Sequence, residues 1–436
     1  MPTLRQCALA VGLAGALAAS GEAAAVDIQA VTSPTGMEAW LVEDHTIPLI
    51  AVSFAFVGGA SQDPAGKAGL ANLMAVTLDE GAGDLDSEAF QARLEDLSIG
   101  LSFDAGLDTF AGSLRTLVEN RDEAVRLLRL ALTEPRFDPE PVARMREQLL
   151  TRIRARERNP GEIAGNALME AAFAGHAYSR PVEGTPESLA AITADDLRAF
   201  HRRVLARDNL RVAVVGAIDG PTLAAMLDQM FAALPAAADT EPVAEAPPLA
   251  SARVDVDMAI PQSEIRIAAP GVKRDDPDYI PAYVAAFLLG GGGPGSRLYD
   301  EVRARRGLAY AISLGLSTLD HGGLVSGGTS TRADQADDVL ALVEAEIALF
   351  AAVGPTADEL AKAKAYLIGS YPLRFRTSSQ IARRLLGIQL DRLGIDYVDR
   401  RSGLIAAVTV EEVRAAAQRL FGDGRLIVVR VGRPAS

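Results

Sequence analysis

Cysteine is almost absent from this sequence. The single cysteine, Cys7, lies in an apolar run that follows Arg5, extends to Ala19 and leads to the small residues Ala23 to Ala25. A basic residue, a short apolar run and a small-residue end are typical of a secretory signal, so we expect cleavage near Ala25 and a periplasmic protein. The mature chain then contains no cysteine, which excludes thiol catalysis and cysteine-bound zinc.

Long apolar runs and basic charge are also scarce. No segment supplies the roughly 20 apolar residues that cross a bilayer, so we expect no membrane anchor. Lys and Arg number 43 against 57 Asp and Glu, which gives a net charge of −14, and aromatic residues make up 5% of the chain. Nucleic-acid binding needs a basic surface. We therefore expect no nucleic-acid partner.

Histidine is the third scarce residue type. The four histidines are too dispersed for a local metal motif: His45, His176, His201 and His321. Neither H-x-x-E-H nor H-E-x-x-H occurs anywhere, and these are the helical spacings that bring two imidazoles to one zinc ion. We expect His176 and His201 in segments that connect helices, as surface or supporting side chains. The sequence predicts no metal ligand in this chain.

The sequence does contain an internal repeat. The apolar segment that follows Pro48 matches the segment that follows Pro261, and the late strand LRVAVVG from Leu210 matches LIVVRVG from Leu426. The two pairs lie at nearly the same offset, as expected for a duplication. We therefore predict four parts: a signal at 1–25, an N-terminal domain at 26–234, a linker rich in proline, alanine and acid at 235–250, and a C-terminal domain at 251–436.

Local patterns predict the fold class of each half. Thr193 with Asp196, and Thr409 with Glu412, have the spacing of a capping box that begins a helix. Strand and helix patterns are mixed without strict alternation, which favours α+β lobes, each a largely antiparallel sheet packed with helices. In the first half we predict strands at 99–105 and 108–117 and helices at 122–131 and 139–156.

Several motifs carry a resemblance to a known family. They are the segment GGASQDP from Gly58, the element Gly69-Leu70-Ala71, the following Asp79-Glu80-Gly81, and GGGGPGSRLYDEVRARRGLAYAI from Gly290 to Ile312. On these residues the chain resembles the pitrilysin/insulinase family of metallopeptidases, in particular its small bacterial members and the mitochondrial processing peptidase subunits. The resemblance implies two homologous lobes that form half of a clamshell chamber.

The zinc motif of that family is missing at its expected place. Active members carry H-x-x-E-H directly after the Gly-Leu-Ala element, and the same register here gives Asn72, Ala75 and Val76. The third family ligand is a glutamate, which the resemblance places at Arg152. A guanidinium group offers only hydrogen-bond donors and cannot coordinate a cation. We expect that the chain binds no zinc and is not a zinc peptidase on its own.

The second half retains a different family element. In the family, an arginine and a tyrosine seven residues apart come from this half and hold the substrate and its developing oxyanion. Arg303 and Tyr310 match that spacing, with Gly307 between them as an expected helix end. An arginine fork suits a carbonyl or carboxylate, and a tyrosine hydroxyl can donate to an oxyanion. The alternative is a solvated arginine beside a packed tyrosine.

A glycine-rich run precedes this element. It comprises Gly290, Gly291, Gly292, Gly293 and Gly295, and it also satisfies the pattern G-x-G-x-x-G of dinucleotide sites. The run follows a helical apolar pattern and not a strand, and no Gly-Lys-Ser/Thr follows, so the dinucleotide interpretation is weak. By similarity to the non-catalytic processing peptidase subunit, we interpret it as a loop near the substrate.

Two functions compete on this sequence. The first is a non-catalytic subunit that binds peptides and completes the active site of a zinc-bearing homologous partner, with zinc held by that partner. The second is a structural or scaffold member of the family with no substrate role. The two differ in whether peptides bind near Arg303 and Tyr310.

Overall fold

The computed structural model describes residues 27–291 and 293–433. The predicted signal at 1–25 and one member of the glycine-rich run, Gly292, lie outside the described residues. Within them, no single helix combines the length and apolarity needed to cross a bilayer, although the bent helix pair 333–353 and 357–369 reaches that length when both are counted together.

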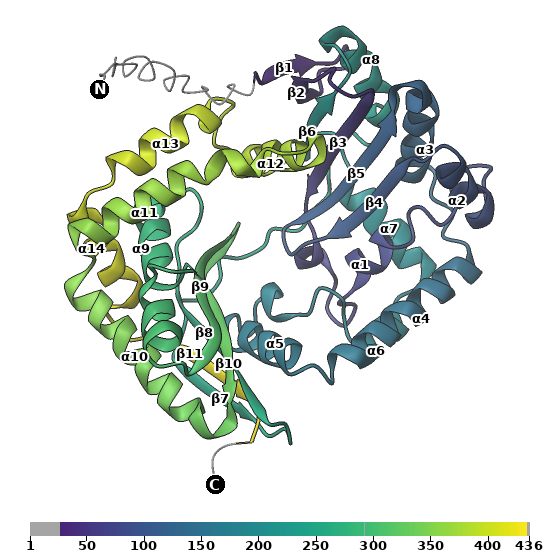
Figure 1. The fold of residues 1–436 in the computed structure, drawn as a ribbon. Coiled ribbons are helices and arrows are strands. Elements are labelled where there is room, and N and C mark those ends of the chain that lie inside the picture. Colours follow the sequence, from purple (N-terminus) through teal and green to yellow (C-terminus); the bar gives the residue numbers. More distant parts are fainter. Residues whose placement is uncertain (1–26, 292, 434–436) are drawn as a thin grey trace, which may run out of the picture.

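The half before the linker contains a six-stranded sheet (Figure 1). Its order is β1-β2-β6-β3-β5-β4, and every neighbouring pair is antiparallel except the parallel pair β2 and β6. The strands are β1 (Gln29–Thr32), β2 (Glu38–Glu43), β3 (Leu49–Val57), β4 (Gly100–Ala105), β5 (Thr109–Leu117) and β6 (Leu210–Gly216). The strands predicted at 99–105 and 108–117 are confirmed.

The half after the linker repeats this sheet without its first strand. The order is β7-β11-β8-β10-β9, again with one parallel pair, β7 and β11. The strands are β7 (Ala252–Val256), β8 (Gln262–Pro270), β9 (Ala309–Leu319), β10 (Gly322–Arg332) and β11 (Ile427–Val431). Two sheets with one strand order confirm the predicted pair of homologous, largely antiparallel lobes.

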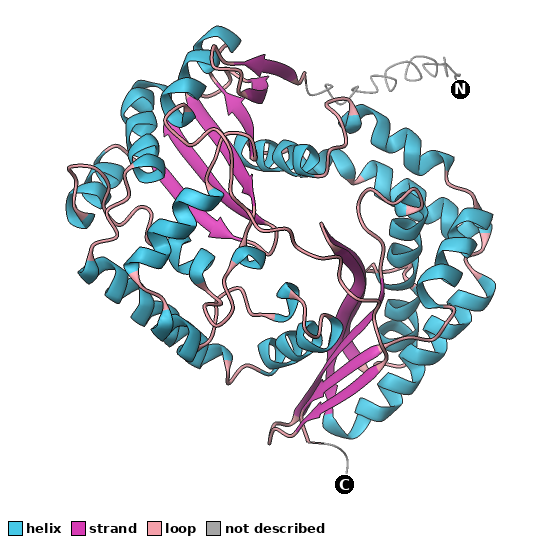
Figure 2. Ribbon diagram, turned by 180° about the vertical axis from the view of Figure 1, so that it is seen from behind, coloured by secondary structure: helices cyan, strands magenta, loops and turns pink. Residues whose placement is uncertain are grey.

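Most of the helices cover the sheets on their outer sides (Figure 2). The first half has α1 (Leu70–Ala75), α2 (Ser87–Asp96), α3 (Arg121–Thr133), α4 (Pro139–Arg156), α5 (Pro160–Ala172), α6 (Pro186–Ala191), α7 (Ala194–Val204) and α8 (Gly220–Phe231). The second half has α9 (Tyr279–Gly290), α10 (Ala336–Val353), α11 (Ala357–Gly369), α12 (Ser378–Leu390), α13 (Tyr397–Ala407) and α14 (Val410–Phe421). Both predicted capping boxes are present, at Thr193 before α7 and Thr409 before α14.

One helix of each half packs on the sheet of the other half. Helix α12 packs on β3 and β6 of the first sheet, where Leu385 meets Trp40 and Ala55 in one apolar cluster. Helix α5 packs on β8 and β11 of the second sheet, where Leu168 joins the cluster of Ala268 and the odd-numbered side chains of β11. These contacts bury the central strands of each sheet on the face that the exchanged helix covers, and the exchange fixes one half against the other.

The predicted linker at 235–250 forms no helix or strand, but hydrogen bonds hold it. The backbone N–H of Asp239 donates to the carbonyl of Arg203 at 2.8 Å, and that of Ala246 donates to the carbonyl of His321 at 2.7 Å. These two partners belong to different halves. The linker is therefore held against both halves by backbone hydrogen bonds and forms part of the packed structure.

A polar contact also joins the two hairpin turns near the linker. The Tyr178 hydroxyl donates to the Asp108 carboxylate at 2.5 Å, and the backbone N–H of His321 donates to that hydroxyl at 3.1 Å. The second carboxylate oxygen of Asp108 accepts from the backbone N–H of Asp320 at 3.0 Å. The turn between β4 and β5 and the turn between β9 and β10 are thereby joined through hydrogen bonds to Asp108 and Tyr178.

Candidate functional site

Helix α1 begins where the family's zinc motif would begin. The Asp63 carboxylate accepts from the backbone N–H groups of Gly69 at 2.8 Å and Ala71 at 2.9 Å, which satisfies the first donors of the helix. Gly69 has a φ of 93°, and a Cβ there would lie 2.7 Å from the carbonyl oxygen of Glu183. Only glycine fits that position. Burial raises the pKa of the Asp63 carboxyl to about 6, against the opposing effect of these hydrogen bonds.

The side chains of this helix do not form a metal site. Ala75 is buried, Asn72 and Val76 are partly buried, and Arg152 is exposed on α4, the helix that packs against α1. The Asn72 amide nitrogen finds no hydrogen-bond partner among the described residues. No cluster of three or more His, Cys, Asp or Glu side chains within 27–291 and 293–433 could hold a metal ion. A carboxamide, two alkyl groups and a guanidinium do not fit zinc.

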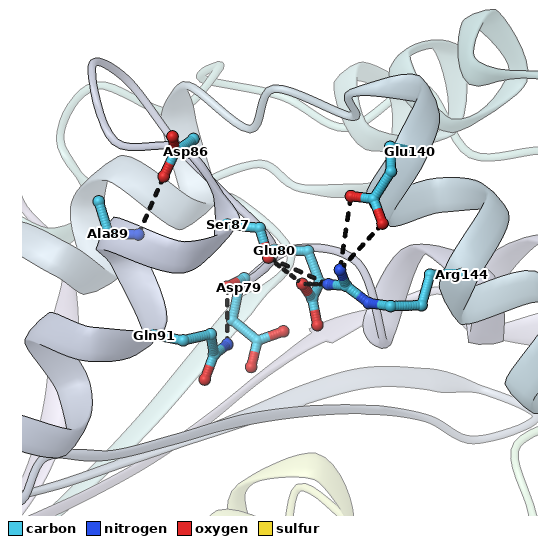
Figure 3. A network of polar contacts seen from close by, with 8 residues as sticks. All are labelled: Asp79, Glu80, Asp86, Ser87, Ala89, Gln91, Glu140 and Arg144. Carbon is cyan, nitrogen blue, oxygen red and sulfur yellow. Dashed lines mark hydrogen bonds and ion pairs between the residues drawn. The ribbon is translucent and has the colours of Figure 1, made fainter.

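The carboxylates that follow α1 are engaged in structure. Glu80 is 8% exposed, forms an ion pair with Arg144, and accepts a hydrogen bond from the Ser87 hydroxyl at 2.5 Å (Figure 3). Arg144 also pairs with Glu140 at 3.3 Å. Burial raises the pKa of the neighbouring Asp79 carboxyl to about 6. The Glu80 carboxylate is thus already neutralised by α4, as expected for a group that links two elements.

The second half brings Arg303 and Tyr310 together. Arg303 lies in a π-helical turn, η4 (Tyr299–Arg305), and Tyr310 lies at the start of β9. Gly307, with a φ of 64°, ends the turn and donates its N–H to the Arg303 carbonyl at 3.0 Å. The Arg303 guanidinium carbon lies 4.7 Å from the centre of the Tyr310 ring. The turn at Gly307 therefore reverses the chain between Arg303 and Tyr310, so that the arginine side chain stacks on the tyrosine ring.

A third residue completes this stack, and the sequence reasoning missed it. The Arg303 guanidinium carbon lies 5.0 Å from the centre of the Tyr299 ring, so the arginine is in contact with two aromatic rings. Such contacts orient a guanidinium plane and leave its edge free to donate hydrogen bonds. The spacing of four residues between Tyr299 and Arg303 was the available signal, because it brings side chains together in a helix. Tyr310 is 83% exposed.

The glycine-rich run divides into two parts. Gly290 ends α9, where a Cβ would lie 2.6 Å from the backbone nitrogen of Leu314, and a Cβ on Gly291 would lie 2.6 Å from the Phe287 ring. These two glycines are required by packing between α9 and its surroundings. Gly293 and Gly295 have open space around them. The run follows a helix, as the sequence predicted, and this is not the strand-to-helix turn of a dinucleotide site.

One histidine prediction was wrong. His201 lies inside α7 and not in a connecting segment, and its Nε2 is 2.8 Å from the carbonyl oxygen of Leu132. Burial lowers the pKa of this imidazole, and the side chain is partly buried. His176 does lie in a connection, where its Nδ1 accepts from the backbone N–H of Tyr178 at 3.1 Å. The amphipathic pattern around His201 would have indicated the helix.

Sequence comparisons find known proteins that are similar over most of this chain. A family profile described as the peptidase M16 inactive domain matches residues 191–367. The non-peptidase homolog YmxG of Helicobacter pylori is 30% identical over 342 residues, which cover 77% of this chain and 78% of the relative. The mitochondrial-processing peptidase subunit beta of Blastocladiella emersonii is 26% identical over 323 residues, 71% of this chain and 68% of the relative.

A solved structure matches the whole arrangement of the two halves. It is the crystal structure of a peptidase M16 inactive domain from Pseudomonas fluorescens, with a TM-score of 0.88 and 28% sequence identity. The match covers 94% of this chain and 98% of that chain. The chain therefore has the fold of that solved structure.

Proposed function

The chain belongs to the pitrilysin (M16) peptidase family as a non-catalytic member, and on that premise we propose that it binds peptides for a zinc-bearing homologous subunit. The signal-like segment at 1–25 supports a periplasmic location for this pair. Zinc and the metal-bound water would come from the partner. This chain would contribute contacts that hold the substrate and its transition state.

The observation that carries the proposal is the exposed stack of Arg303 and Tyr310. A tyrosine that is 83% exposed adds little to folding, because its ring stays in water. Arg303 forms no ion pair with any described residue, although ion pairs surround it, such as Arg305 with Glu301. Its two aromatic contacts fix its direction without using its donors. A preoriented guanidinium and a free hydroxyl are suited to a carbonyl and an oxyanion.

The contrast with α1 supports a division of labour. The first half offers no ligand for zinc and no general base at the family's positions, so in this proposal another chain supplies bond cleavage. The second half still presents a donor pair. When two subunits line one site, contacts from one subunit can stabilise the transition state of a reaction that the other subunit catalyses. A relative named as a processing peptidase subunit supports the expectation of a partner.

The test is steady-state kinetics of the chain reconstituted with a zinc-bearing homologue that co-purifies from the native host. We expect Tyr310→Phe to lower turnover roughly 10- to 1000-fold, the scale of one lost oxyanion donor. Arg303→Ala should raise the Michaelis constant as well. Tyr366→Phe and Arg305→Ala are matched controls, since Tyr366 is 62% exposed on α11 and Arg305 is exposed beside the site. Unchanged kinetics in both site variants, with assembly intact, would favour the scaffold function.

Metal analysis of the purified chain tests the other half of the proposal. We expect far less than one zinc ion per chain and no chelator-sensitive cleavage of a fluorogenic peptide, because Asn72, Ala75, Val76 and Arg152 supply no ligand set. One tightly held zinc ion per chain, with cleavage that a chelator abolishes, would contradict the proposal.

A further inference from the structure

Five arginines gather around one cavity away from Arg303 and Tyr310. A cavity of about 490 Å³ in the second half is lined by α9, α12, α13 and the turn η6 (Tyr371–Arg374); these helices lie together in Figure 1. Neither Arg303 nor Tyr310 lines it. The volume is in the range of roughly 300 to 1,000 Å³ that small-molecule sites occupy.

The charge of the lining is strongly one-sided. Five arginines line the cavity, namely Arg274, Arg374, Arg383, Arg384 and Arg401, and the only lining carboxylate is Asp391. Asp391 pairs with Arg274 at 3.3 Å. The other four arginines form no ion pair within the part of the chain that the structure describes. In a protein of net charge −14, so many unpaired cations around one cavity indicate a site for a negatively charged ligand.

Two buried polar groups of the cavity lack the partners that burial requires. Arg401 is 6% exposed, and the one hydrogen bond that its guanidinium donates to a described residue goes to the carbonyl of Leu367, at 3.2 Å. Tyr371 is 5% exposed, and its hydroxyl has no hydrogen-bond partner among the described residues. A buried cation without a counter-charge, and a buried hydroxyl without a bond, each cost free energy. A bound anion that accepts from both groups would remove both costs.

Aromatic rings hold the guanidinium groups in place. The guanidinium carbon of Arg401 lies 4.1 Å from the centre of the Tyr371 ring, and that of Arg384 lies 5.7 Å from the same ring. Arg274 stacks at 3.8 Å on Tyr279. Stacking occupies the faces of the guanidinium planes and leaves the N–H edges available. Such edges match phosphate oxygens two at a time.

We propose that this cavity binds a small organic phosphate. A doubly charged phosphate compensates several unpaired arginines, which a single carboxylate would not. Ile280, Leu393 and Ile405, together with the tyrosine rings, provide apolar lining for the organic part of the ligand. The site does not depend on the peptide-binding function, because it shares no residue with that element.

Titration calorimetry on the purified mature chain tests the proposal, with phenyl phosphate as the probe. We expect saturable binding of phenyl phosphate, and weaker binding of inorganic phosphate by roughly 10-fold or more, since inorganic phosphate lacks the ring that the apolar lining would bury. Benzoate carries the ring with a single charge and should also bind more weakly. Tyr371→Phe and Arg384→Gln should each weaken phenyl phosphate binding roughly 10-fold, the scale of a lost hydrogen bond to a charged group.

The matched control is Arg400→Gln. Arg400 lies on α13 next to Arg401 but outside the cavity, where it pairs with Asp396, so its replacement should leave binding unchanged. Both cavity variants avoid the buried Arg401, and circular dichroism checks that they remain folded. Three results would overturn the proposal: no binding of phenyl phosphate to the folded chain, equal losses in Arg400→Gln and the cavity variants, or benzoate binding as tight as that of phenyl phosphate.

Discussion

The two halves of this protein share a scaffold but differ in what they present on it. Their sheets have one strand order, and a threonine capping box begins the corresponding helix in each half. At the positions of the zinc motif on α1 the first half has a buried alanine and partly buried neutral side chains, whereas the second half has a tyrosine that is 83% exposed. Strand order and caps are set by backbone requirements, so a duplication can preserve them while the side chains of a site change independently.

The exchanged helices extend this comparison to stability. Leu385 of α12 is fully buried against the first sheet, and Leu168 of α5 is buried against the second. Each half therefore completes its core with a helix from the other half. Without the exchanged helix, the apolar side chains that it covers on the central strands of each sheet would be exposed, so we expect the two halves to unfold together.

Removing these leucines should have the largest effect. We expect Leu385→Ala and Leu168→Ala each to lower the free energy of unfolding by about 2 to 5 kcal/mol, because each leaves a cavity in a closed apolar cluster. Leu349→Ala is the control, since Leu349 is 48% exposed on α10. Thermal unfolding followed by circular dichroism measures all three. Two separate transitions in either core variant would show that the halves unfold independently.

Much of this fold could be predicted from the sequence. The helix predicted at 139–156 has the bounds of α4, because Pro139 begins it and the apolar spacing is regular. Alternation also separates the two faces of β8, where Ile265 and Ile267 face one apolar cluster and Ala268 faces the other. The exchange of α5 and α12 could not be predicted, since an apolar helix face does not specify which sheet covers it.

Only the part of the candidate site that depends on local sequence could be predicted. The pairing of Arg303 with Tyr310 followed from a motif and a glycine turn, both of which are local. The arginine cavity was missed because its lining comes from separate segments, such as Arg274 before α9 and Arg401 on α13. No local spacing joins them, and only tertiary packing brings these cations together.

Breaking the ion pair beside α1 should have the next largest effect. Glu80→Gln removes the charge that neutralises Arg144 and weakens the hydrogen bond from Ser87. We expect a loss of about 2 kcal/mol, typical of a hydrogen bond to a charged group, and less than for a fully buried pair because the Arg144 side chain is 39% exposed. Urea unfolding measures it. Wild-type stability in Glu80→Gln would show that α1 and α4 do not depend on this contact.

The neighbouring Asp79 should behave in the opposite way. Burial raises the pKa of its carboxyl to about 6, above the usual 3.8, so the stability that the protonated carboxyl contributes is complete below pH 3.8 and is lost as the pH rises through about 6. The carboxamide of Asp79→Asn does not ionise and stays neutral over this pH range. We expect the variant to match the wild type near pH 4 and to exceed it by roughly 1 to 2 kcal/mol at pH 7. Urea midpoints measured from pH 4 to 7 test this, and a difference independent of pH would contradict it.

The smallest effect compares the two capping boxes directly. Thr193 accepts from the backbone N–H of Asp196, and Thr409 accepts from that of Glu412, each at 3.2 Å. Because the two caps have the same geometry, Thr193→Ala and Thr409→Ala should each cost about 1 kcal/mol, the usual value for a lost N-cap. Thr193→Ser and Thr409→Ser retain the oxygen and should restore most of that stability. Equal losses in the two halves, measured as shifts in the thermal unfolding midpoint, would support cooperative unfolding of the exchanged lobes. A loss in only one half would show that this half alone determines when the protein unfolds.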